Sequence, residues 1–181
     1  MRKRLSAEDW IEAGLRALAH QGFAALKADL LAKALDVSRG SFYWHFSDVD
    51  AFHDAVLERW RVRATEAVIT DIEGQNAPED RLSALMQRAL RADLRIESAI
   101  RAWAFSNQRV HRKVELVDRE RLAYLEKLLT TPKTPKAKAR AKALLIHWTY
   151  VGFAVAAGHA RPWGQIAPVF DQLLALAELG V

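Results

Sequence analysis

The chain has 181 residues, of which 51% are hydrophobic and 27% charged, a balance typical of a folded globular protein. It contains no cysteine, which excludes a disulfide framework, a thiolate zinc site and cysteine catalysis. The net charge is +5, but residues 1–63 hold ten Lys or Arg against nine Asp or Glu, so a broad positive field is excluded there and any nucleic-acid binding must rely on individually placed cations.

The N-terminal residues Met1-Arg2-Lys3-Arg4 lead directly into a polar stretch, without the apolar core of a signal peptide. No apolar run approaches the roughly 20 residues that span a bilayer. We therefore expect a cytoplasmic protein. The first predicted helix begins at Ser6, whose spacing to Asp9 is that of a capping box, and ends at Gly22. Its inward face consists of Trp10, Ile11, Gly14, Leu15 and Leu18.

Residues 22–46 predict two short helices joined by a tight turn. An apolar face at helical spacing marks the first helix and stops at Asp36-Val37. Ser38 is predicted to cap the second helix with its hydroxyl, and Phe42 and Phe46, four residues apart, to face inward. This is the pattern of a helix-turn-helix, whose second helix enters the DNA major groove. The first helix is predicted to bury Leu30, Leu31, Ala34 and Leu35, and the second to point Arg39, Ser41, Tyr43, Trp44 and His45 outward.

The motif resembles, at matching spacings, the DNA-binding signature of the TetR family of transcriptional regulators. The resemblance implies an all-α fold of about nine helices, with a three-helix DNA-binding domain at residues 1–63 and its helix-turn-helix at about 27–46. Residues 64–181 would then form a helical ligand-binding and dimerisation domain. The residues that carry the resemblance are Gly22-Phe23, Leu31-Ala32, Ala34, Val37-Ser38, Gly40, Tyr43 and His45-Phe46.

Two positions depart from the family pattern. Asp36 stands where the family usually has Gly, although Asp enters the left-handed backbone region more readily than most residues, so we expect the turn to survive. Val49 stands where the family often has a Lys that meets a phosphate. We expect Lys27, at the start of the first motif helix, to supply a replacement cation.

The DNA-binding residues are predicted from this placement. Arg39, one residue past the cap, has the forked donor that suits the two major-groove acceptors of guanine. Trp44 is expected to meet a thymine methyl or a sugar edge, and the hydroxyl and imidazole groups to reach phosphates. The full predicted set is Lys27, Ser38, Arg39, Gly40, Ser41, Tyr43, Trp44 and His45.

A long helix is expected from Ser47 to Glu73-Gly74, about 40 Å in length. The segment 74–78, which contains Gly and Pro, then marks a break. Further helices are predicted near residues 82–90, 96–106 and 110–131 from their apolar spacing, and no strand pattern occurs in the sequence. Thr134-Pro135 begins another helix, and a last one follows Gly164.

The helix that contains residues 144–157 is apolar on all sides, which requires burial on all sides. Its apolar area and that of the last helix exceed what one small domain can cover, so we expect both helices to pair with their copies in a homodimer. The predicted contacts are Val151, Val155, Phe170, Leu173, Leu174 and Ala177.

The family resemblance also places a ligand cavity among the later helices, and an apolar cavity with a few polar groups suits a small lipophilic or aromatic effector. The simpler interpretation is that several of these side chains fill the core. The candidate effector-binding residues are Trp60, Met86, Trp103, Asn107, His111, His147, Trp148 and Tyr150.

No motif of an enzyme is present: the sequence lacks Gly-x-Ser-x-Gly, a glycine-rich phosphate loop and His-Glu-x-x-His. We therefore expect no catalysis, no metal and no cofactor. The predicted function is transcriptional regulation by binding double-stranded DNA, as a repressor of a palindromic operator that a small molecule releases. The alternative is a helical adaptor without sequence-specific DNA binding. A second basic cluster, at residues 133–142, is expected to be a solvated helix face.

Overall fold

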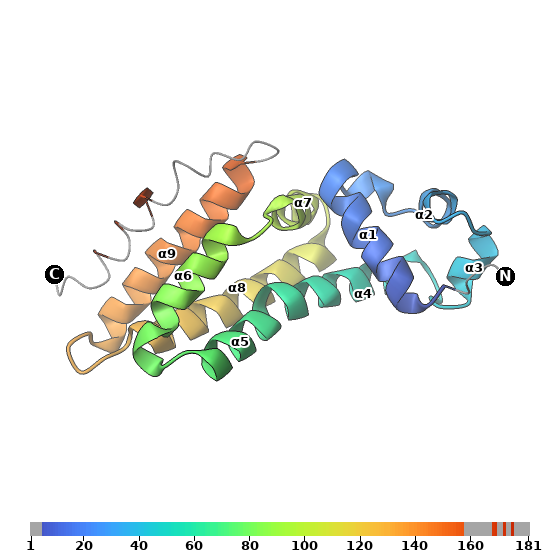
Figure 1. Cartoon of the computed structure of the whole chain (residues 1–181). Helices are drawn as coiled ribbons and strands as arrows, with labels where there is room; N and C mark the ends of the chain where they lie inside the picture. The colour runs from blue at the N-terminus through green and yellow to red at the C-terminus, as the bar shows by residue number, and fades with distance from the viewer. Residues whose placement is uncertain (1–4, 158–167, 170–171, 173–174, 176–181) are drawn as a thin grey trace. The chain divides into compact units, whose positions relative to one another are not determined.

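The computed structural model describes residues 5–157 together with 168–169, 172 and 175 (Figure 1). The described residues contain helices and turns but no β-strand; Thr131 and Thr134 form an isolated bridge. The predicted all-α fold is therefore confirmed. None of the helices in these ranges is long and apolar enough to cross a membrane.

The chain divides into two compact units. Unit 1 combines Met1–Arg63 with Arg95–Val114, and unit 2 combines Ala64–Leu94 with Glu115–Val181. Unit 1 contains α1 (Ala7–Gln21), the short 3-10 helix η1 (Phe23–Ala25), α2 (Ala28–Ala34), α3 (Arg39–Tyr43), α4 (Val49–Arg61), α7 (Arg95–Ala104) and the first turns of α8 (Gln108–Leu129).

Helix α1 has the predicted ends. The Ser6 hydroxyl accepts a hydrogen bond from the Asp9 backbone N–H at 3.2 Å, and the Asp9 carboxylate accepts one from the Ser6 N–H at 2.7 Å. At the other end Gly22 adopts φ 73°, which favours glycine, and its N–H donates to the Leu18 carbonyl at 3.0 Å. The capping box and the glycine stop are confirmed.

The inward face of α2 differs from the prediction. Ala28, Leu31 and Ala32 are buried, whereas Leu30 is 44% exposed and Ala34 is exposed. The predicted burial of Leu30 and Ala34 was therefore wrong. Residues 28, 31 and 32 share one side of a helix, and in so short a helix the position of the packing partners selects which apolar side faces inward.

Helix α4 begins one residue later than predicted. Asp48, not Ser47, is its N-cap, and the Asp48 carboxylate accepts the Ala51 N–H at 2.7 Å. The expected long helix to Glu73-Gly74 is helical without a gap from Val49 to Gln75, but a π-helix at Val62–Glu66 divides it into α4 and α5 (Ala67–Gln75). Apolar residues four apart do not reveal the extra residue that one π turn accommodates.

Unit 2 contains α5, the 3-10 helix η3 (Pro78–Asp80), α6 (Arg81–Arg91), the rest of α8 and α9 (Lys136–Ala157). The break predicted at 74–78 is confirmed, since α5 ends at Gln75 and Pro78 opens η3. Helices α6, α8 and α9 share one apolar core (Figure 1). Its buried residues are Met86, Leu122, Leu125, Leu129, Ala139, Ala143 and Ile146.

Helix α9 is not buried on all sides within the described chain. Ala139, Ala143 and Ile146 face the core, whereas Trp148 is 62% exposed and Val155 48% exposed. Among the described residues, α9 therefore keeps apolar side chains exposed. The predicted contacts Phe170, Leu173, Leu174 and Ala177 lie outside the described residues.

Candidate nucleic-acid interface

Helix α3 is anchored by Phe42, which is fully buried. The Phe42 ring meets Trp10 of α1 edge-on at 5.3 Å and Phe52 of α4 at 5.2 Å, and lies 5.1 Å from Phe46. Such edge-to-face pairs add to the burial of apolar area and restrict ring orientation. The inward placement of Phe42 and Phe46 is confirmed, and these contacts fix α3 against α1 and α4.

The opposite side of α3 is polar and aromatic. Trp44 is 81% exposed, Tyr43 is 45% exposed, and Arg39 and Gly40 are also exposed. Ser41 and His45 are half-buried beside them. With Ser38 and Trp44, these two residues line a shallow pocket of about 230 Å³. The structure thus brings the predicted set from Ser38 to His45 together on one surface.

The turn before α3 has the expected backbone. Asp36 has φ 52°, in the left-handed region, and no other non-glycine residue in the described ranges has positive φ. The Val37 N–H donates to the Ala32 carbonyl at 3.0 Å, which satisfies a carbonyl at the end of α2. Asp36 therefore does replace the glycine of the turn.

Ser38 occupies the N-cap position of α3 but does not cap through its side chain. Its backbone carbonyl accepts the Ser41 N–H at 3.0 Å, and the hydroxyl makes no capping bond. The predicted capping bond was therefore wrong. Ser38 lines the pocket together with Ser41, Trp44 and His45.

Arg39 and Tyr43 form a pair that the sequence analysis missed. Nη2 of Arg39 donates a hydrogen bond to the Tyr43 hydroxyl at 3.1 Å, and the guanidinium carbon lies 5.7 Å from the centre of the Tyr43 ring. This hydrogen bond is the main cause of a raised pKa at Arg39. The i, i+4 spacing of the two residues was the available signal.

The start of α4 is acidic, and a cation from far along the chain lies against it. Val49 is half-buried between the exposed Asp48 and Asp50. Arg109, in the first turn of α8, pairs with Asp50 at 3.3 Å and with Asp54. No local sequence pattern indicated this contact. Lys27 is exposed at the N-cap of α2, as predicted.

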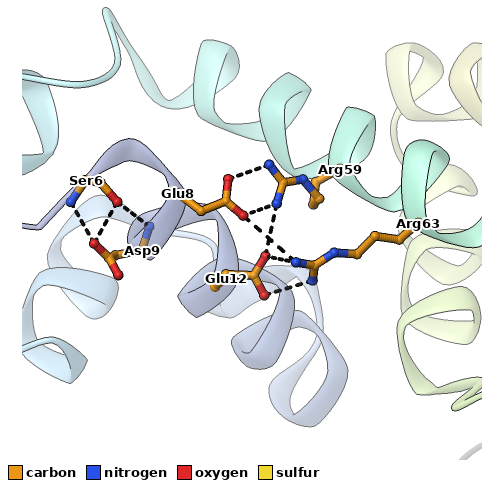
Figure 2. Close-up of polar contacts among 6 residues, drawn as sticks. All are labelled: Ser6, Glu8, Asp9, Glu12, Arg59 and Arg63. Atoms are coloured by element: carbon orange, nitrogen blue, oxygen red, sulfur yellow. Dashed lines mark hydrogen bonds and ion pairs between the residues drawn. The ribbon is translucent and has the colours of Figure 1, made fainter. Parts of the chain in front are cut away.

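A second set of ion pairs joins α4 to α1 (Figure 2). The guanidinium of Arg59 binds both carboxylate oxygens of Glu8 and reaches Glu12 at 3.4 Å. Arg63 binds the same Glu12 at 2.6 Å. Glu8 and Glu12 lie one turn apart on α1, as do Arg59 and Arg63 along the opposite segment, so the four side chains form a matched cluster.

Helix α7 packs in unit 1 mainly against α1, and side-chain contacts to α4 and η1 accompany this packing. The indole N–H of Trp60 donates to Glu97 at 3.1 Å, and Glu97 also pairs with Arg101 at 2.8 Å. Trp103 stacks on Phe23, with ring centres 4.4 Å apart. Trp60 and Trp103 were both predicted effector-binding residues, and here they pack within the unit that contains the helix-turn-helix.

The remaining effector candidates are distributed over both units. Asn107 caps α8, since its side-chain oxygen accepts the N–H groups of Arg109 and Val110 at 3.0 and 3.2 Å. In unit 2, His147 is buried and lies 3.2 Å from Asp118. Effector binding stays a prediction for the whole set. Unit 1 holds Trp60, Trp103, Asn107 and His111, and unit 2 holds Met86, His147, Trp148 and Tyr150.

Unit 2 contains further polar groups on α8. Arg121 donates to the Thr65 hydroxyl at 3.0 Å and lies over the Tyr150 ring at 5.6 Å. The Tyr124 hydroxyl is buried and has no hydrogen-bond partner among the described residues, and burial raises its pKa. No group of three or more His, Cys, Asp or Glu side chains suited to a metal occurs within the described part of the chain.

Residues 11–56 match the model of the bacterial regulatory proteins, tetR family. No curated protein matches the chain. A crystal structure of a transcriptional regulator from Rhodococcus sp. Rha1 is 22% identical over 97% of this chain and 97% of its own, with a TM-score of 0.80.

Two other solved structures carry ligands. BioQ with its natural double-stranded DNA operator is 20% identical over 96% of this chain and 98% of its own, with a TM-score of 0.58. FadR from Bacillus subtilis in complex with stearoyl-CoA is 16% identical over 97% of this chain and 100% of its own, with a TM-score of 0.68. Residues 11–56 thus match the tetR-family model, and the chain has the fold of these solved structures.

Proposed function

We propose that this chain, a regulator with the DNA-binding domain and fold of the TetR family, is a cytoplasmic homodimeric repressor that leaves a palindromic operator when a small molecule binds. The observation that carries the proposal is the outward face of α3. Arg39, Tyr43 and Trp44 are exposed there, while Phe42 holds the helix rigidly from behind. A surface that is both rigid and rich in donors suits recognition of base edges.

Each side chain on this face has a distinct proposed role. Arg39 reads a guanine through its forked donor, and Trp44 meets a thymine methyl or a sugar edge. Lys27 binds a phosphate from the start of α2. Phosphate oxygens are also the proposed partners of Ser38, Ser41, Tyr43 and His45.

DNA binding is tested with duplexes from beside the protein's own gene and a scrambled duplex, each at two salt concentrations. Arg39→Ala should reduce affinity by roughly 1 to 3 kcal/mol per half-site and relax preference at one base pair. Lys27→Ala should weaken both duplexes alike and flatten the salt dependence. Absence of any binding at low salt would favour the helical adaptor instead.

The homodimer is proposed from the open apolar face of α9, where Leu145, Trp148 and Val155 are exposed. A two-fold contact between copies would cover these side chains, and a two-fold dimer matches the symmetry of a palindromic operator. Sedimentation at micromolar concentration should give a dimer. Trp148→Lys should shift the equilibrium toward monomer, and a monomeric wild type would overturn the proposal.

The effector is proposed to bind among the later helices. FadR from Bacillus subtilis, which has this fold, was crystallised with stearoyl-CoA, and this supports a lipophilic ligand by analogy. A ligand shifts the equilibrium between two arrangements only if it binds one more tightly. Thermal unfolding in the presence of aromatic and long-chain acyl compounds tests the proposal. A compound that raises the unfolding temperature must also lower the affinity for the operator. If no compound in the panel shifts the unfolding temperature, this result argues against the site.

A further inference from the structure

We infer that Tyr43 is a positioning residue for Arg39, so that one chain of hydrogen bonds links a phosphate contact to the reading of one base pair. The inference rests on the proposed function, because it requires α3 to enter the major groove. It assigns Tyr43 a part in sequence discrimination, which a phosphate contact alone would not give.

The Tyr43 ring is itself in contact with a buried ring of the same helix. Its ring meets the buried Phe42 ring edge-on, with centres 5.3 Å apart and an interplanar angle of 81°. Phe42 is in turn fixed by Trp10 and Phe52. Although Tyr43 is partly exposed, this contact restricts the orientation of its ring on the surface of α3.

Two contacts hold the Arg39 side chain against Tyr43. The Nη2 group donates to the Tyr43 hydroxyl at 3.1 Å, and the guanidinium carbon lies 5.7 Å from the ring centre. An exposed arginine has a large rotamer entropy, which is lost when it binds a base. Because Tyr43 already restricts the side chain before binding, less of that entropy is lost on the DNA.

Arg39 and Tyr43 have enough donors and acceptors to bind each other, a guanine and a phosphate at the same time. A guanidinium has five N–H donors, so one bond to Tyr43 leaves enough for the fork that guanine accepts. The Tyr43 oxygen accepts from Arg39, and its own proton remains to donate to a phosphate oxygen. The positive charge of Arg39 polarises the hydroxyl and strengthens that second bond.

The test is a double-mutant cycle on the full-length protein. The fluorescence anisotropy of an operator duplex, and of duplexes with each base pair replaced in turn, gives discrimination at every position. Arg39→Ala should lose discrimination at one base pair. Tyr43→Phe keeps the ring and removes the hydrogen bond to Arg39. Its discrimination at that same base pair should fall by roughly 3- to 10-fold. The double variant should discriminate no worse than Arg39→Ala alone.

Ser41→Ala is the matched control, because it removes another hydroxyl of the same face with no bond to Arg39. It should weaken all duplexes alike and keep discrimination. Uniform weakening by Tyr43→Phe, or additive losses in the double variant, would overturn the inference while Arg39 still reads a base. If the wild type binds operator and scrambled duplex equally, the proposed function itself fails and the inference falls with it.

Discussion

The guanidinium of Arg109 pairs with the carboxylate of Asp54, although the two residues lie 55 positions apart in the chain. Arg109 also reaches Asp50, 3.3 Å away. Both carboxylates lie in the first two turns of α4, which begins shortly after α3. Arg109 thus neutralises an acidic turn close to the proposed DNA surface.

Arg109→Ala should therefore weaken binding to every duplex by roughly 2- to 5-fold at low salt, because the uncovered carboxylates repel phosphates. The loss should shrink as salt is raised. Affinities for an operator and a scrambled duplex at two salt concentrations measure both effects. Adding Asp50→Asn and Asp54→Asn to Arg109→Ala should restore affinity; if it does not, Arg109 acts in another way.

The position of Val49 gives a related prediction. Val49→Lys adds a cation at the site of the missing phosphate contact, so it should tighten binding to operator and scrambled DNA together. The ratio of the two affinities should stay unchanged, since a phosphate contact carries no sequence information. The same anisotropy titrations test this, and a gain confined to the operator would contradict it.

The cluster of Glu8, Glu12, Arg59 and Arg63 should stabilise the packing of α1 on α4 (Figure 2). Arg59→Ala should lower the free energy of unfolding by about 1 kcal/mol, as expected for a partly exposed network. Arg63→Ala should cost less, because Arg63 is the more exposed cation and Glu12 keeps Arg59 as a partner. Urea unfolding of both variants measures the difference, and equal losses would contradict this ranking.

Glu58 should make unfolding depend on pH. Hydrogen bonds from Arg61 and Lys113 lower the pKa of Glu58 to about 2. A lowered pKa stabilises the fold above the ordinary value of 4.5, and that contribution is lost as pH falls from there toward about 2. The carboxylate is 45% exposed, so we expect a contribution below about 1 kcal/mol.

The check is urea unfolding at pH 6 and pH 3. Glu58→Gln should lose stability at pH 6 and clearly less at pH 3. At pH 3 the carboxylate is protonated in the unfolded chain but still largely ionised in the folded one, so more than half of its contribution is already lost. Glu79→Gln, at an exposed position in η3, is the matched control and should behave like the wild type. An equal loss for Glu58→Gln at both pH values would show that charge is not the cause.

Gly14 should tolerate no side chain. A Cβ there would lie 2.6 Å from Phe52 Cζ and 3.1 Å from Val56 Cγ2, so Gly14→Ala should cost about 1 to 3 kcal/mol. Gly74 in α5 is the matched control, because a Cβ at that position meets nothing within 4 Å. Gly74→Ala should stabilise by up to about 1 kcal/mol. Thermal unfolding compares the two, and similar shifts would contradict the close approach of α1 and α4.

Local patterns could be predicted from the sequence because their physics is local. The capping box of Ser6 and Asp9, the stop at Gly22, the left-handed Asp36 and the inward Phe42 all depend on groups within a few residues of one another. The four-residue spacing of Phe42 and Phe46 also sufficed to predict which side chains of α3 point outward. The fold class followed, since every segment had helical spacing.

Contacts between distant segments were decided only by the tertiary structure. Leu30 faces outward because packing, not spacing, selects the inner side of a short helix. Trp60 and Glu97 are 37 residues apart, and their hydrogen bond, like the stacking of Trp103 on Phe23, joins α7 to the unit of the helix-turn-helix. Periodicity shows that a residue such as Trp103 is buried, but its partner depends on which helices meet, and that is determined by the packing of the whole chain.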